Sequence, residues 1–167
     1  MAPDYVLVEE SFATQLIDAI KNKLTEFYSA DAANSQDYGR IVSERHLTRI
    51  VSYLDSQEIV SGGKYDVKNK YIEPTIVLNP AHDSLLMQQE IFGPILPIVT
   101  VKNIGESIPF VNERAKPLAL YVFSKNKDFE QQVLTSTSAG MVCINDGFMF
   151  AANPNLPFGG VGNSGTG

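Results

Sequence analysis

The chain has 167 residues, 44% of them hydrophobic, and carries a formal net charge of −6 at pH 7. Its size and composition suit one globular domain with a real core, and its acidic balance disfavours nucleic acid or an anionic membrane surface as a partner. No apolar run reaches the roughly 18 residues of a membrane span, and one cysteine with two histidines gives neither a disulfide framework nor a metal-site spacing.

Two amphipathic helices are predicted in the first third of the chain. Tyr5–Val8 is a short apolar strand, and Ser11 is expected to cap the helix that follows. The apolar stripe of this helix recurs at helical spacing, at Phe12, Leu16, Ile17, Ile20, Leu24, Phe27 and Tyr28. A second helix is expected from Ser43 to Ser56, with Ser43 as its N-cap. His46 lies beside its buried stripe, so we interpret it as a partly exposed surface residue rather than a catalytic one.

In the middle of the chain, the sequence predicts two strands joined by a polar connection. Ile59 and Val60 begin a short strand, and Gly62–Asn69 is a turn-rich, charged connection. Tyr71–Leu78 is expected to form one further strand. Pro74 lies inside it and cannot donate to a ladder, so we expect an edge strand or a bulge there.

The stretch Glu90–Pro94 predicts a sharp break between a polar helical turn and a buried strand. Pro94 forces the residue before it out of the helical region, and the apolar run Ile95–Val101 is typical of a strand covered on both faces. Glu90 and Phe92 precede that strand at a fixed break, where they can face a cleft. The alternative is a structural elbow with an exposed glutamate and a core phenylalanine.

The last third of the chain continues the alternation of helices and strands. Pro109 lies in a predicted helix, Asn103–Arg114, and should bend it. A strand, a helix and a strand follow at Leu118–Phe123, Asp128–Ser136 and Gly140–Asn145. This alternation predicts an α/β layer sandwich with a mainly parallel sheet. Ligands bind such sheets at the carboxyl ends of strands, so the irregular segment after Asn145 is a candidate site wall.

Two features imitate functional sites. Gly160, Gly162 and Gly165 match the spacing of the dinucleotide-binding fingerprint, but that fingerprint needs a strand before it and a helix after it. Neither is predicted here, so we expect a mobile or packed glycine loop. Cys143 lies inside an apolar strand with no neighbour in sequence that would lower its pKa, so we interpret it as structural rather than as a nucleophile.

Five motifs in order along the chain resemble the aldehyde dehydrogenase superfamily, and most closely its class 3 and fatty aldehyde branch. They are Ala2–Leu7, Asp37–Ile41 with Arg45–His46, Gln89–Pro94, Lys116–Tyr121 and Leu156–Gly165. The resemblance implies that residues 1–167 form part of a catalytic domain, a three-layer sandwich with a mainly parallel sheet that is incomplete at both ends. A preceding cofactor domain and a following bridging segment are expected to be absent.

The resemblance also implies where the chemistry lies. The family's nucleophile motif has the form Gly-Gln-x-Cys-x-Ala-Pro-Asp-Tyr, and Ala2–Tyr5 match its end. The nucleophilic cysteine and the general-base glutamate are therefore expected upstream of Met1, with no catalytic residue in this chain, which we expect to be inactive alone. No metal ligand is expected.

The intact relative would use NAD or NADP to oxidise apolar aldehydes, fatty or aromatic, through a cysteine thiohemiacetal and a thioester. Glu90 and Phe92 match the family's cofactor-binding positions, and Phe148, Ala151 and Ala152 match its substrate-binding positions. Phe148 and Phe150, with Met149, would suit such an aldehyde. The alternative for these aromatic residues is that they close the domain's own core. The resemblance further implies a cytoplasmic homodimer, with no membrane contact from this segment, although some fatty aldehyde relatives carry a C-terminal anchor outside it. The alternative function is a non-catalytic interaction or nucleotide-binding module derived from the same fold.

Overall fold

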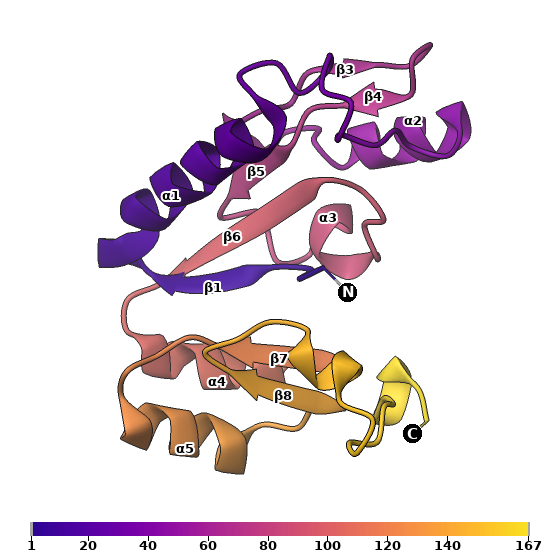
Figure 1. Cartoon of the computed structure of the whole chain (residues 1–167). Coiled ribbons are helices and arrows are strands. Elements are labelled where there is room, and N and C mark those ends of the chain that lie inside the picture. The colour runs from indigo at the N-terminus through magenta and orange to yellow at the C-terminus, as the bar shows by residue number, and fades with distance from the viewer. Residues whose placement is uncertain (1, 167) are drawn as a thin grey trace. The chain divides into compact units, whose positions relative to one another are not determined.

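The computed structural model describes residues 2–166 and divides into two compact units (Figure 1). The N-terminal unit comprises residues 2–102, and the C-terminal unit is described over residues 103–166. Each unit has its own strands, helices and hydrophobic core. Strand pairs are mainly parallel, as the alternation of elements predicts.

A four-stranded sheet forms the centre of the N-terminal unit. Its strands, in spatial order, are β1 (Val6–Glu9), β6 (Ile95–Val101), β5 (Thr75–Leu78) and β2 (Glu58–Ser61). β6 is parallel to both neighbours, and β2 is antiparallel to β5. The predicted strand after Pro94 is therefore confirmed, and five of its seven residues are buried.

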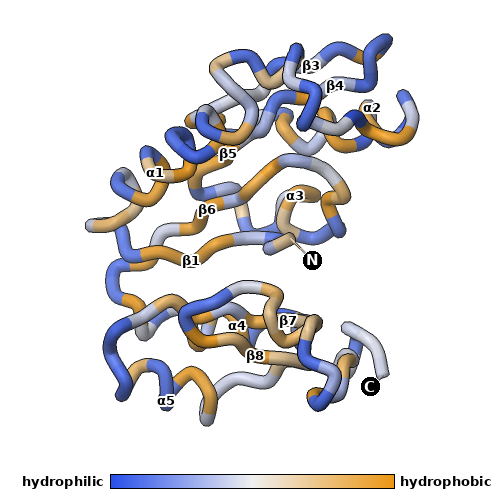
Figure 2. The backbone as a smooth tube through the Cα atoms, in the orientation of Figure 1, coloured by the Kyte–Doolittle hydropathy of each residue, from blue (hydrophilic) through white to orange (hydrophobic). Residues whose placement is uncertain are grey.

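Helices cover both faces of this sheet, so the unit has three layers. Ile76 and Ile98 pack with the helix α1 (Glu10–Tyr28) on one face. Val77 and Ile95 pack on the other face with α2 (Glu44–Ser52) and the short α3 (Leu85–Gln88). Successive residues of β5 thus point to opposite faces, as the two-residue period of a strand requires. Figure 2 shows hydrophobic residues along β1 and β6 and hydrophilic residues over much of the outer loops.

The first helix differs from its prediction at its start and in its stripe. α1 begins at Glu10, directly after β1, and its N-cap residue is Glu9, whose side chain makes no capping hydrogen bond. The prediction that Ser11 caps this helix was therefore wrong. Phe12 and Phe27 are exposed, while Ala13 and Ile17 are the buried residues. The apolar stripe is therefore narrower than the spacing alone indicates. In contrast, Ser43 caps α2 as predicted, because its side-chain oxygen accepts a hydrogen bond from the backbone N–H of His46.

Pro74 divides the segment that was predicted as one strand. Tyr71–Ile72 forms β4, which pairs in a small antiparallel hairpin with β3 (Tyr65–Asp66), and the chain then enters β5 in the main sheet. β5 lies between β6 and β2, so an edge position was also wrong. Because Pro74 lacks an N–H group, it falls between two ladders rather than inside one.

The C-terminal unit is built on two parallel strands. β7 (Ala119–Val122) pairs with β8 (Met141–Ile144), and α5 (Lys127–Ser136) connects them. Its core includes Ile108, Val122 and Val133. The predicted helix 103–114 is instead a 3₁₀ turn, η1 (Ile104–Glu106), followed by α4 (Ser107–Asn112). Pro109 lies in the first turn of α4, where its missing N–H removes no helical hydrogen bond. After β8 come two further 3₁₀ turns, η2 (Met149–Ala152) and η3 (Gly162–Ser164).

Candidate functional site

The segment Glu90–Pro94, hereafter the elbow, turns the chain from α3 into β6. The backbone leaves the helical region at Gln89, and Phe92 adopts a left-handed conformation with φ of 51°. The elbow is fixed to the sheet at its far end, because the N–H of Thr75 donates to the carbonyl of Pro94 at 2.8 Å. The conformation of the elbow is therefore constrained at its start by the end of α3 and at its far end by the hydrogen bond to Thr75.

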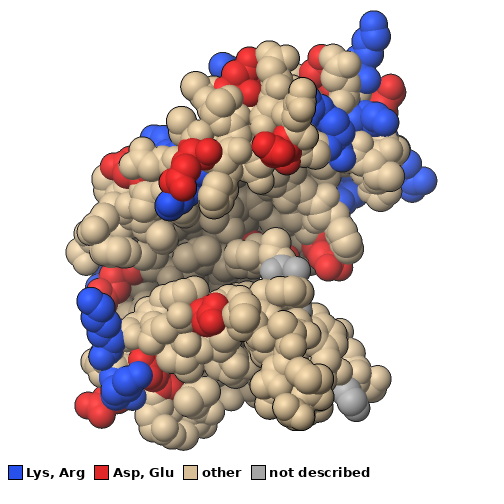
Figure 3. Space-filling view, viewed as in Figure 1, with Lys and Arg blue, Asp and Glu red and all other residues tan. Residues whose placement is uncertain are grey.

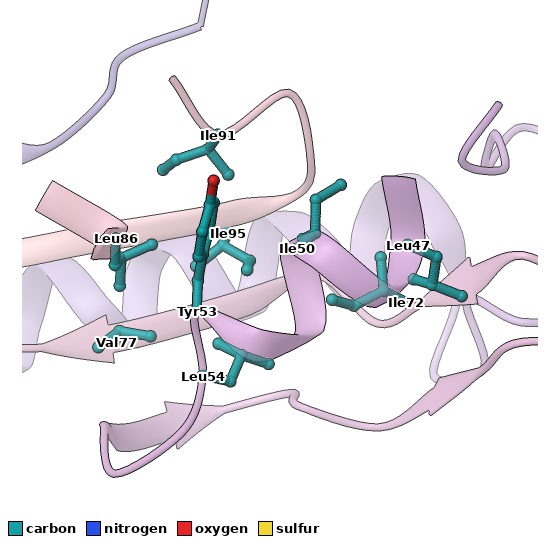
Figure 4. Close-up of a cluster of buried hydrophobic side chains, with 9 residues drawn as sticks. All are labelled: Leu47, Ile50, Tyr53, Leu54, Ile72, Val77, Leu86, Ile91 and Ile95. Carbon is teal, nitrogen blue, oxygen red and sulfur yellow. The ribbon is translucent and has the colours of Figure 1, made fainter. Parts of the chain in front are cut away.

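Ile91 anchors the elbow in the hydrophobic core between the two candidate residues. It is 4% exposed and belongs to the cluster that includes Tyr53 and Leu86. Figure 4 shows the Tyr53 ring near Leu86 and Ile95, with its hydroxyl end directed toward Ile91. A Cβ atom on Gly93 would lie 2.9 Å from Cδ1 of Ile50, so any larger residue here would require the Ile50 side chain to shift.

Glu90 and Phe92, on either side of Ile91, are both exposed. Phe92 is 73% exposed, so the alternative of a core phenylalanine was wrong. A bulky residue with positive φ is an outlier, and such strained residues cluster at functional sites. A large ring held in solvent on a strained and anchored backbone does not help this unit to fold. It is available to pack against another group.

Arg49, in the last turn of α2, forms hydrogen bonds to the elbow. Its Nη2 donates to the carbonyl of Ile91 at 2.8 Å, and its Nη1 donates to the carbonyl of Glu90 at 3.2 Å and to the Tyr53 hydroxyl at 2.6 Å. Sequence reasoning missed Arg49. The signal available was a cation in a helix's last turn, which is common for reasons of helix polarity alone.

Asp4 lies close enough to Glu90 for their charges to interact. Burial raises the pKa of Asp4 above its usual value, and the charge of Glu90 raises it further. The sheet explains this proximity, because β1 and β6 are parallel and Val6 is paired with Ile98. The segments that precede β1 and β6 therefore lie at the same end of the sheet, where both strands begin. The result is a pair of neighbouring carboxylates, Asp4 and Glu90, at this end of the sheet.

The other candidate residues lie in the loop that follows β8 in the C-terminal unit. Phe148 has a left-handed backbone with φ of 64° and is 49% exposed, and Ala151 and Ala152 in η2 are exposed. Phe150 is buried and stacks on Tyr121, with ring centroids 5.9 Å apart. The alternative that these aromatics close the core therefore holds for Phe150, while Phe148 is half-exposed with its ring centroid 6.3 Å from that of Phe150.

Asn145 fixes the start of this loop, and sequence reasoning missed it as well. Its backbone has φ of 56°, and its N–H donates to the carbonyl of Val122 at 2.7 Å. Its side-chain oxygen accepts from the N–H of Ser124 at 2.9 Å, and its amide donates to the buried Glu130 at 3.3 Å. An asparagine directly after an apolar strand is the only sequence signal for this arrangement.

The remaining candidates have structural surroundings. His46 is exposed on α2, and Cys143 is half-buried in β8 opposite Tyr121. A Cβ atom on Gly160 would lie 2.3 Å from the carbonyl oxygen of Ser164, so the glycine loop is tightly packed on itself, and the short η3 lies within it. Within residues 2–166 no group of three or more His, Cys, Asp or Glu side chains could hold a metal ion. No helix in that range is long and apolar enough to cross a membrane.

Comparisons with known proteins agree on one family. The model of the aldehyde dehydrogenase family matches residues 1–167. The dimeric NADP-preferring aldehyde dehydrogenase of Rattus norvegicus is 46% identical over 167 residues, and the 4,4'-diaponeurosporen-aldehyde dehydrogenase of Staphylococcus aureus is 49% identical over 169 residues. Each alignment covers the whole of this chain and 37% of the relative.

A solved structure is similar to this chain over almost its whole length. The substrate-bound state of Staphylococcus aureus AldH matches 99% of this chain and 37% of its own with a TM-score of 0.94 and 49% sequence identity. The fold predicted from the alternation of strands and helices is therefore confirmed. The chain spans a little over a third of the length of these relatives.

Proposed function

The chain belongs to the aldehyde dehydrogenase family, and from that premise we propose that it forms part of the catalytic domain of an NAD(P)-dependent enzyme that oxidises apolar aldehydes to carboxylic acids. The observation that carries this proposal is the elbow. It presents a carboxylate, Glu90, and an aromatic ring, Phe92, on a backbone that Ile91 and Arg49 anchor. Such a pair suits a ligand with hydroxyl groups beside a flat ring.

The nicotinamide-ribose end of NAD or NADP has these features and fits the residues present. The Glu90 carboxylate would accept hydrogen bonds from ribose hydroxyls, and Phe92 would pack against the ring region. The cofactor, when bound, accepts the hydride that leaves the substrate carbon. The elbow's contribution is to bind and orient, which raises the rate by holding reacting groups in place.

The oxidation itself needs groups that we place outside residues 1–167. A cysteine thiolate before residue 1 would attack the aldehyde carbon, forming a thiohemiacetal. Loss of hydride from that carbon leaves a thioester, and water, activated by a glutamate, cleaves the carbon–sulfur bond to release the carboxylic acid and the thiol. In this proposal the domain is partial, and the chain alone is inactive.

The loop after β8 is the proposed substrate contact. Phe148, Ala151 and Ala152 are exposed there, and an apolar lining of this kind suits an aliphatic or aromatic aldehyde. Asn145 holds the start of the loop through its bonds to Ser124 and Glu130. By analogy with the rat relative, which is named as dimeric and NADP-preferring, we propose a homodimer, and by the same resemblance a cytoplasmic one.

Production of NADH or NADPH with hexadecanal and benzaldehyde tests this function. It should be measured for residues 1–167 and for the same chain extended upstream to include the nucleophile and cofactor segments. We expect activity only in the extended protein. Activity in neither would refute the enzyme and favour a non-catalytic interaction module. Turnover by residues 1–167 that Cys143→Ser abolishes would refute both the upstream nucleophile and the structural interpretation of Cys143.

A further inference from the structure

Arg49 uses its guanidinium on backbone carbonyls rather than on a carboxylate. Its two terminal nitrogens donate to Glu90, Ile91 and Tyr53, and it forms no salt bridge within residues 2–166. The contact with Glu90 is to its carbonyl oxygen, so the Glu90 carboxylate stays available. The guanidinium also lies over the Tyr53 ring, 5.2 Å from its centroid. These contacts place the Arg49 guanidinium against the backbone of the elbow at Glu90 and Ile91.

The two carbonyls that Arg49 holds lie next to the strained residue. Ile91 precedes Phe92, whose φ of 51° must be maintained against the preference of its side chain for negative values. A planar guanidinium with forked donors can fix the direction of two neighbouring carbonyls at once, which a lysine ammonium cannot do. Fixing these peptide planes also fixes where the Glu90 and Phe92 side chains leave the backbone.

We propose that Arg49 is a positioning residue, which holds the elbow in the conformation that binds the nicotinamide-ribose end of the cofactor. This inference rests on the proposed function. It deepens that function by assigning cofactor affinity to a residue on a different element, α2, that touches the elbow only through its backbone carbonyls. Without Arg49 the elbow would sample several conformations, and apparent affinity falls by the fraction of time it spends in the competent one.

The test is a double-mutant cycle in the intact enzyme that contains this segment. Arg49→Met keeps an unbranched apolar stem and removes the guanidinium with all its donors. If the elbow is then competent a tenth of the time, the Kd for NAD(P) rises about tenfold, with the KM for aldehyde unchanged. Arg49→Lys should recover part of the loss. In a Glu90→Gln/Phe92→Ala background, Arg49→Met should have no further effect on the Kd, because a residue that acts through others is non-additive with them.

Arg45→Met is the matched control. Arg45 is exposed and lies one turn earlier on α2, so the control makes the same change of charge without removing a hydrogen bond to the elbow. We expect the Kd of this variant to equal that of the wild type. Amide hydrogen exchange without cofactor gives a readout that does not depend on function, and Arg49→Met should speed exchange in the elbow peptide, residues 89–93, but not in the β6 core.

The possible results separate the inference from the function. A Kd for Arg49→Met equal to that of the wild type, or a loss that is the same in both backgrounds, would overturn the positioning role. A wild-type enzyme that binds neither NAD nor NADP would refute the proposed function and, with it, the cofactor part of the inference. The rate of amide hydrogen exchange in the elbow, compared between Arg49→Met and the wild type, would then decide whether Arg49 fixes the backbone there.

Discussion

Phe92 combines two properties that folding alone does not favour. Its ring is exposed, and its backbone is left-handed. A non-glycine residue in this region costs about 1–3 kcal/mol, and the ring returns little of that cost because it buries little surface. Ile91, Arg49 and the Thr75–Pro94 hydrogen bond together supply the constraint that maintains the strain. Strain of this kind at an exposed aromatic is consistent with the cofactor contact that we propose for Phe92.

Phe92→Gly should therefore separate stability from binding. Glycine accepts the left-handed φ without a side-chain clash, so the free energy of unfolding should stay equal or rise by up to about 1 kcal/mol. Cofactor affinity of the intact enzyme should fall, because the ring is lost. Urea denaturation and cofactor titration measure the two effects. A large loss of stability would mean that the ring supports the fold instead.

The raised pKa of Asp4 predicts how stability depends on pH. A folded-state pKa above the unfolded value means that the folded protein binds the proton more tightly. The stabilisation is fully present below the ordinary value of 3.8 and is lost as pH rises through the folded pKa. Asp4→Asn removes this loss, so the variant should be more stable than the wild type at neutral pH, and the difference should shrink as pH falls toward 4.

Denaturation of both proteins between pH 4 and pH 7 measures this difference. Glu90→Gln serves as a partial control, because it removes the charge that contributes to the shift but not the burial. It should lower the pKa of Asp4 without returning it to the ordinary value. A stability difference that does not change with pH would contradict the assignment.

At the scale of elements, two asparagines end strands in the same way. Asn79 follows β5 and Asn145 follows β8, both with left-handed φ. In each, the backbone N–H donates to the neighbouring strand and the side-chain oxygen accepts the next free N–H of that neighbour, from Thr100 or Ser124. The side chain thus extends the ladder by one bond while the backbone turns away. In the C-terminal unit this device begins the proposed substrate loop.

Asn145→Ala should cost roughly 2 kcal/mol of stability, since it removes two side-chain hydrogen bonds worth about 1 kcal/mol each. Asn145→Gly should cost less, because glycine tolerates the left-handed φ although it loses the same bonds. Urea denaturation ranks the variants. Equal stability of Asn145→Ala and the wild type would show that water replaces these bonds at no cost.

Periodicity and caps predicted most elements, because they depend on neighbours in sequence. The buried strand after Pro94 and the cap at Ser43 are examples. The break at Pro74, the exposure of Phe92 and the Arg49 contacts could not be predicted in this way. They depend on which sheet a strand joins and on packing between residues about 40 positions apart. Glu90 and Phe92 were singled out from the break before Pro94, because side chains at such a break can face a cleft. Their cofactor role came only from the family motif and remains a prediction.

At the scale of the whole molecule, the chain exposes much apolar surface. Five large hydrophobic side chains of the C-terminal unit are between 49% and 71% exposed: Phe123, Phe148, Met149, Leu156 and Phe158. Most of the face of this unit that Figure 3 shows is uncharged. Exposed apolar surface of this kind is typical of interfaces. Residues 1–167 alone should self-associate, with a mass by light scattering that rises with concentration. A constant monomeric mass would contradict this.

Whether the elbow binds the cofactor is decided by the NAD(P) dissociation constant of Glu90→Gln in the intact enzyme. This change keeps the size of the side chain and removes the charge that would bind the ribose hydroxyls, so the Kd should rise about tenfold. Glu58→Gln, a change at an exposed carboxylate on β2, is the control and should leave the Kd unchanged. Cofactor affinity of Glu90→Gln equal to that of the wild type would contradict the account, because the elbow would then not be the cofactor-binding surface.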